Sequence, residues 1–167
     1  YLSGQMGAAW VQGVQSRGVG ASLKHFAANN QEAHRMVVDT IIDERSLREI
    51  YLPGFEITVQ EAQPWTVMCS YYLVNGTYAS ENPLLLTQLL KHEWGHTGLV
   101  VSDWGACNDR TKSFAAGMEL EMPGNSCIHT PAVLAALDSG ELTLEQLDAA
   151  AGRVIELILK SKPALDK

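Results

Sequence analysis

GLVVSDWGA, residues 98–106, places a short apolar run directly before an acidic residue, Asp103. Leu99, Val100 and Val101 are apolar at consecutive positions, so the run has no polar face. Strands of this kind are typical of a parallel sheet that helices cover on both faces. The stretch therefore predicts a buried strand over 98–103, with Asp103 at its carboxyl end.

Similar short apolar runs recur along the chain, and segments with helical spacing separate them. Besides 98–103, the sequence predicts strands over 19–26, 64–71 and 118–122. Thr143 and Gln146 form a capping box, and Pro53 predicts a break within the second helix. The predicted helices are 4–16, 43–62, 83–94, 108–116, 131–139 and 143–161. This alternation indicates an α/β fold with parallel strands.

Length limits how much of such a fold the chain can complete. A closed (β/α)8 barrel needs about 250 residues, whereas the chain has 167. On pattern alone, an open sheet of about four strands could stand by itself. On the barrel interpretation, the chain forms about four parallel strands with covering helices, as part of a (β/α)8 barrel that this chain alone does not close.

Composition disfavours several classes of partner. The formal net charge of -7 and the pI of about 5.1 argue against nucleic acid and anionic membranes, which bind basic surfaces. No apolar run approaches the ~20 residues that span a bilayer. Cys69, Cys107 and Cys127 form no C-x-x-C pair, so neither a disulfide framework nor a thiolate zinc site is indicated. We expect no cofactor.

Polar residues gather where the predicted strands end, and the carboxyl ends of parallel strands form the active-site face of such folds. Taken singly, Asp103 could instead be a helix N-cap, and Lys24 with His25 could be a solvated pair. Trp104 could be core, or it could form the floor of a sugar site. The residues at the four ends are Lys24-His25, Ser70-Tyr71, Ser102-Asp103-Trp104 and Glu121-Met122.

Long motifs carry a resemblance to a known family from Tyr1 to about Lys160. They are KHFAANNQEAHR (24–35), VDTIIDERSLREIYLPGFE (38–56), PWTVMCSYYLVNGTYASEN (64–82), LLKHEWGHTGLVVSDWGA (89–106) and AAGMELEMPG (115–124). Together they resemble the β-glucosidases of glycoside hydrolase family 3. The resemblance implies a TIM-like barrel as the first domain, an α/β-sandwich domain after it, and an active site between the two.

The resemblance also implies an activity: retaining hydrolysis of terminal β-D-glucosidic bonds through a covalent glycosyl-enzyme. Asp103 matches the nucleophile, which nearby Lys24 and Arg35 would keep ionised. Such an enzyme needs a second, protonated carboxyl group ~5–5.5 Å away. Lys24, His25 and Arg35 match residues that hydrogen-bond sugar hydroxyls. Met68 and Tyr71 match walls of the subsite, and Trp104 matches the aromatic residue beside the nucleophile.

The parts of the family that this chain does not match define the partners we expect. The acid/base glutamate would come from a domain after residue 167, and an aspartate and an arginine of the first subsite would come from before Tyr1. We expect residues 1–161 to be a partial barrel domain and 162–167 to begin an interdomain linker. The chain alone should be inactive towards a β-glucoside or a small β-linked oligosaccharide. A β-xylosidase of the same family and a non-catalytic sugar-binding fragment remain alternatives.

Two local features stand apart from this interpretation. After MCSY the family usually shows Asn, often followed by Lys, whereas Tyr72 and Leu73 occupy those positions here. His92-Glu93-Trp94-Gly95-His96 also matches the H-E-x-x-H pattern of zinc proteases. Gly95 should end the helix before His96. A third ligand is conceivable downstream at Glu119 or Glu121, but both lie in a segment better interpreted as a strand at the rim of the active site. We therefore disfavour a metal site.

Overall fold

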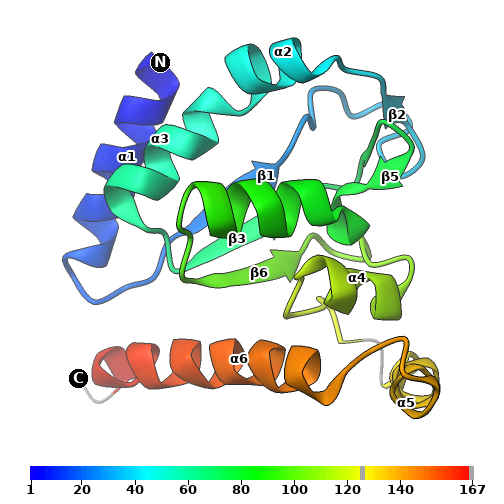
Figure 1. The fold of residues 1–167 in the computed structure, drawn as a ribbon. Coiled ribbons are helices and arrows are strands. Elements are labelled where there is room, and N and C mark those ends of the chain that lie inside the picture. Colours follow the sequence, from blue (N-terminus) through cyan, green and yellow to red (C-terminus); the bar gives the residue numbers. More distant parts are fainter. Residues whose placement is uncertain (125–126, 166–167) are drawn as a thin grey trace.

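A parallel sheet forms the centre of the computed structural model, which describes residues 1–124 and 127–165. Its strands are β1 (Ser22–Phe26), β3 (Thr66–Cys69) and β6 (Leu99–Ser102), in the order β1-β3-β6. Val67 pairs with Leu23 on one side and with Val100 on the other. Both strand pairs are parallel, which confirms the predicted α/β class with parallel strands. The sheet is open and does not close into a barrel (Figure 1).

The fourth predicted strand, 118–122, is reduced to one parallel bridge between Val101 and Leu120. The N–H groups of Glu119 and Leu120 both donate to the carbonyl of Val100. The N–H of Val100 donates at 2.7 Å to a side-chain oxygen of Glu119. Because a carboxylate occupies the place of the next main-chain carbonyl, the ladder does not extend.

Helix α1 (Leu2–Gln15) lies against α3 (Pro53–Ala62) on one side of the sheet (Figure 1). Small residues let the two helices approach closely, since a Cβ atom at Gly4 would lie 3.1 Å from the side chain of Ile57. The segment before α3 holds α2 (Glu44–Ser46) and the π-helical turn η1 (Leu47–Tyr51). The break predicted at Pro53 is confirmed, because Pro53 begins a new helix.

The main core lies between the sheet and the π-helical segment η3 (Leu84–Glu93). Leu85, Leu86, Leu89 and Leu90 are buried against it, with Phe26, Val67 and Trp94 among their partners in the cluster. Their spacing is the apolar stripe expected of a helix that covers a sheet. This packing fixes β3 and β6, whose carboxyl ends carry candidate site residues.

A second, smaller sheet was not predicted. It contains β2 (Asp39–Thr40), β4 (Leu73–Val74) and β5 (Thr77–Tyr78), with the short η2 helix (Ala79–Glu81) after it. Each strand has two residues, which is too short for a periodic signal. The one usable cue is Asn75-Gly76, since both residues have positive φ and this pair favours a tight hairpin turn.

The remaining helices are α4 (Arg110–Ala116), α5 (Thr130–Ser139) and α6 (Leu144–Leu165), close to the predicted ranges. The capping box before α6 is confirmed, since Thr143 N–H donates to Gln146 at 2.9 Å and Gln146 N–H donates back at 3.2 Å. Helix α6 continues to Leu165, into the stretch where we predict a linker over 162–167. Within the described residues, no helix is long and apolar enough to cross a membrane.

Candidate active site

The three strands of the main sheet end in register. Phe26 pairs with Cys69, and Cys69 pairs with Ser102, so the last residues of β1, β3 and β6 form one row. Asp103, directly after β6, contacts Tyr71 in the segment after β3 and His25, the next-to-last residue of β1. The structure thus brings together three of the predicted site residues at the carboxyl end of the sheet, as parallel topology requires.

The two carboxylate oxygens of Asp103 have different surroundings. Oδ1 accepts a hydrogen bond from the Tyr71 hydroxyl at 3.1 Å and another from the Trp104 N–H at 2.7 Å. Oδ2 lies 3.3 Å from Nε2 of His25. The Asp103 side chain keeps 15% of its surface exposed, so the carboxylate is sheltered but open to a ligand. Oδ1 is thus oriented by the main chain of Trp104 and by Tyr71, and Oδ2 lies beside His25.

An irregularity in β1 explains how His25 reaches Asp103. Leu23 pairs with Val67 and Phe26 pairs with Cys69, which leaves Lys24 and His25 together opposite Met68. Such a bulge turns a side chain away from strict alternation. His25 contacts Asp103, and both His25 and exposed Lys24 line a hollow of about 460 Å³ with Tyr51 and Phe55. Half-buried Met68 lies on β3, the middle strand of the sheet, between β1 and β6.

Arg35 reaches the site through Tyr71. Its guanidinium stands 4.6 Å above the centre of the Tyr71 ring and forms an ion pair with Glu32 at 2.7 Å. The same Tyr71 O–H also lies 2.8 Å from the carbonyl of Trp104, so its one proton is shared between that carbonyl and Oδ1 of Asp103. The Trp104 side chain is 55% exposed. Sequence reasoning missed Glu32, whose ion pair with Arg35 forms within an irregular loop.

The pKa values of the site follow from burial and charge. Burial lowers the pKa of His25 below its ordinary value, and Lys24 lowers it further, against the opposing effect of Asp103. Burial raises the pKa of Tyr71, and its hydrogen bond to Asp103 adds to that shift. At neutral pH the imidazole is therefore largely uncharged, and Tyr71 keeps its proton as a donor to Asp103.

Other predicted strand-end residues have structural partners. Ser70 donates to the carbonyl of Ala27 at 2.8 Å, and Ser102 accepts a hydrogen bond from Met122 N–H at 2.8 Å. Glu121 forms an ion pair with Arg110 at 3.9 Å, and its carboxylate lies 3.3 Å from Nε2 of His129. These contacts join strand ends to neighbouring segments.

The two histidines of the H-E-x-x-H motif lie in different surroundings. Helix η3 ends at Glu93, and Gly95 with φ of +69° turns the chain before His96, as predicted. His92 is exposed and His96 is buried. The Glu93 carboxylate is bound by Arg48 at 2.7 and 3.2 Å. Over residues 1–124 and 127–165, no group of three His, Cys, Asp or Glu side chains could hold a metal ion.

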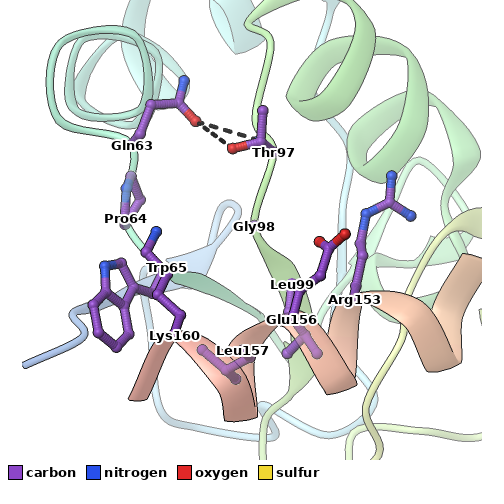
Figure 2. A pocket seen from close by; sticks show the side chains of 10 residues that line it. All are labelled: Gln63, Pro64, Trp65, Thr97, Gly98, Leu99, Arg153, Glu156, Leu157 and Lys160. Atoms are coloured by element: carbon purple, nitrogen blue, oxygen red, sulfur yellow. Dashed lines mark hydrogen bonds between the residues drawn. The ribbon is translucent and has the colours of Figure 1, made fainter. Parts of the chain in front are cut away.

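A separate hollow of about 170 Å³ lies at the opposite, amino ends of β3 and β6 (Figure 2). Gln63 there accepts hydrogen bonds from the N–H and hydroxyl of Thr97, at 3.3 and 3.4 Å, and Nζ of Lys160 lies 4.9 Å above the Trp65 ring. These contacts join α6 and the loop before β6 to the start of β3. The hollow is remote from Asp103 along the strands.

The sequence of this chain matches known proteins along nearly its whole length. Residues 1–157 match the profile of the glycosyl hydrolase family 3 N terminal domain. The chain is 54% identical over 158 residues to a thermostable beta-glucosidase B of Acetivibrio thermocellus, covering 95% of this chain and 21% of that protein. It is 50% identical over 165 residues to an exo-alpha-(1->6)-L-arabinopyranosidase of Bifidobacterium breve, covering 99% and 22%.

Solved structures show the same likeness. A beta-glucosidase of Bifidobacterium adolescentis superposes with a TM-score of 0.90 at 51% sequence identity, over 94% of this chain and 23% of that chain. The chain thus spans about a fifth of the length of the curated relatives it matches.

Proposed function

The chain belongs to glycoside hydrolase family 3, and from that membership we propose that it carries the nucleophile of a retaining β-glucosidase. The observation that carries the proposal is the unequal treatment of the Asp103 oxygens. The Tyr71 hydroxyl and the Trp104 N–H lie within hydrogen-bond distance of Oδ1, whereas the described partner of Oδ2 is Nε2 of His25, at 3.3 Å. A nucleophilic carboxylate needs this combination of fixed orientation and one available oxygen.

In the proposed reaction, Oδ2 of Asp103 attacks the anomeric carbon of a terminal β-D-glucoside. The bond from that carbon to the leaving oxygen breaks, and its electron pair stays on the leaving oxygen, which takes a proton from an acid. Water then attacks the anomeric carbon of the glycosyl-enzyme and gives up a proton to the residue that acted as the acid in the first step. Asp103 leaves as a carboxylate.

The other site residues supply binding. Lys24, His25 and Arg35 are positioned on or after β1 as donors to sugar hydroxyls. Lys24 shares a hollow with Tyr51, and Arg35 stands over the Tyr71 ring. The half-buried Met68 and the Tyr71 ring would wall the subsite. The exposed Trp104 ring would cover the apolar face of the sugar.

We propose that the acid/base residue comes from a part of the enzyme outside these 167 residues. The chain spans about a fifth of its curated relatives, so the complete enzyme has room for further domains. On this proposal, residues 1–161 form part of the barrel domain, and 162–167 lead towards the domain that supplies the acid.

Chemical rescue tests the nucleophile in the complete enzyme. Asp103→Ala should lower turnover of an aryl β-D-glucoside by orders of magnitude, because the covalent route is lost. Added azide should restore turnover and release an α-glucosyl azide, since azide fills the space of the missing carboxylate. Asp138→Ala, at an exposed position on α5, is the matched control and should keep its activity. Full activity of Asp103→Ala, or a covalent 2-fluoroglucoside label on another residue, contradicts the proposal.

A second candidate activity rests on the relatives. One is named for arabinopyranoside cleavage at 50% identity, close to the 54% of the β-glucosidase. The same nucleophile would serve either sugar, and a β-xyloside as well. A panel of aryl β-D-glucoside, β-D-xyloside and α-L-arabinopyranoside, compared by kcat/KM, separates them. Sugar binding without turnover of any of them would favour the non-catalytic alternative.

A further inference from the structure

Tyr72 occupies the position where the family resemblance leads us to expect asparagine, and it is only 1% exposed. Tyr71 and Tyr72 point to different partners. Tyr71 donates to Asp103, whereas the Tyr72 hydroxyl bonds both main-chain groups of Gln31. It accepts from Gln31 N–H at 2.9 Å and donates to the Gln31 carbonyl. One buried hydroxyl therefore holds one residue of a distant loop.

That loop, 29–37, connects β1 to β2 and has no helix or strand of its own. Its other hydrogen bonds are local: Gln31 donates to Ala33, and Val37 N–H donates to His34. Of the hydrogen bonds described for residues 29–37, those that reach a distant segment all end on Tyr72. Just past the loop, Leu73 N–H donates to the carbonyl of Val38 at 3.0 Å, so within residues 29–37 the phenol of Tyr72 is the described hydrogen-bonded anchor to a distant segment.

The loop carries Arg35, whose side chain is 45% exposed. Its described contacts are the ion pair with Glu32, in the same loop, and the stacking on Tyr71. The ion pair moves with the loop and cannot fix it against the sheet. A single exposed stacking contact contributes about 0.5–1 kcal/mol, too little to hold a loop against its own entropy. The place of the guanidinium relative to Asp103 must come from the main chain.

We infer that Tyr72 is a positioning residue, which holds loop 29–37 so that Arg35 reaches a sugar hydroxyl beside Asp103. This inference rests on the proposed function. A phenol reaches farther from its own chain than an asparagine amide does, so this sequence can place the loop with a contact that asparagine could not make. Holding the loop before substrate arrives lowers the entropy lost on binding.

Tyr72→Phe in the complete enzyme tests the inference, because it removes the hydroxyl and keeps the buried ring. We expect KM for an aryl β-D-glucoside to rise about three- to tenfold, as for the loss of one or two hydrogen bonds, with kcat changed by less than about twofold. The peptide covering 29–37 should exchange its amide hydrogens faster. Tyr78→Phe on β5, where no hydrogen bond of the hydroxyl is described, should leave KM and exchange unchanged.

A double mutant links Tyr72 to Arg35. Arg35→Ala should raise KM. Adding Tyr72→Phe to it should raise KM no further, because the loop then carries no guanidinium that could bind the sugar. A further rise would mean that Tyr72 acts on substrate binding by another route, and would overturn the inference.

Failure of the inference and failure of the proposed function give different results. If Asp103→Ala abolishes turnover and Arg35→Ala raises KM, while Tyr72→Phe changes neither KM nor loop exchange, the inference falls and the proposed function stands. If Arg35→Ala leaves KM unchanged, Arg35 does not bind the sugar, and both its proposed role and the inference are overturned.

Discussion

At the scale of single residues, Asp103 owes its orientation to Tyr71 and to the main chain of Trp104. The residue type and its place after an apolar run are visible in the sequence. The contact with Tyr71 is not, because the two residues are 32 positions apart and meet only when β3 and β6 pair.

Tyr71→Phe should lower kcat/KM of the complete enzyme about tenfold or more. It removes a hydrogen bond to a charged oxygen, and such bonds contribute about 1.5–3 kcal/mol. Steady-state kinetics on an aryl β-D-glucoside measures the effect, with Tyr78→Phe as the control. Unchanged kcat/KM would mean that the Trp104 N–H suffices to orient Asp103.

His96 makes the stability of the fold sensitive to acid. Burial lowers the pKa of His96 from 6.5 to about 4, and the positive charge of Lys91 adds to that shift. The unfolded chain takes up this proton below about pH 6.5, whereas the folded protein does so only near pH 4. Stability from this group is therefore complete above pH 6.5 and falls as pH drops towards 4, by on the order of 3 kcal/mol.

Denaturant unfolding at pH 7 and pH 4.5 checks this expectation. His96→Leu should lose less stability between the two pH values than the parent protein does. The His96 ring is buried, with 3% of the residue exposed, so we expect an apolar side chain of similar size to fit there. His92→Leu, at an exposed histidine, should keep the parent profile. Equal losses in His96→Leu and the parent would contradict the assignment.

At the scale of elements, Glu119 joins β6 to two helices. Its carboxylate accepts from Val100 N–H at 2.7 Å, and it pairs with Lys91 of η3 and with Arg153 of α6. Its side chain is 2% exposed. Sequence reasoning placed Glu119 in a strand at the rim of the site. Glu119 is buried beside β6 because its carboxylate pairs with the two cations Lys91 and Arg153.

Glu119→Gln should destabilise the protein by about 3–5 kcal/mol, because it leaves buried Lys91 without its charged partner. A urea unfolding midpoint measures the loss. Glu145→Gln, at an exposed position in the first turn of α6, serves as the control and should change stability by less than about 0.5 kcal/mol. A loss as small as that of the control would show that Lys91 finds other acceptors.

At the scale of the whole molecule, helices α1 and α6 leave apolar side chains uncovered. Leu2, Met6 and Trp10 of α1 are each more than 60% exposed, and Ile155, Ile158 and Leu159 of α6 are each more than 55% exposed. Surfaces of this kind suit contact with further protein, in keeping with the proposed partial barrel.

The purified 167-residue chain should show no turnover of an aryl β-D-glucoside. It carries the proposed nucleophile but lacks the proposed acid, and a retaining glycosidase needs both carboxyl groups. A discontinuous assay with long incubation measures this, with the complete enzyme as the positive control. Turnover by the chain that is lost in Asp103→Ala would place the acid within these residues.

The main parallel strands and the long helices follow from the sequence, because apolar periodicity and capping are local signals. The position of Asp103 after its strand and the break at Pro53 also follow from local signals in the sequence. The two-residue strands of the small sheet, the bulge that turns His25 and the burial of Glu119 do not, because each depends on which distant segment lies alongside. Local patterns specify the elements, whereas contacts such as Tyr71 to Asp103 and Tyr72 to Gln31 exist only once packing has brought separate elements together.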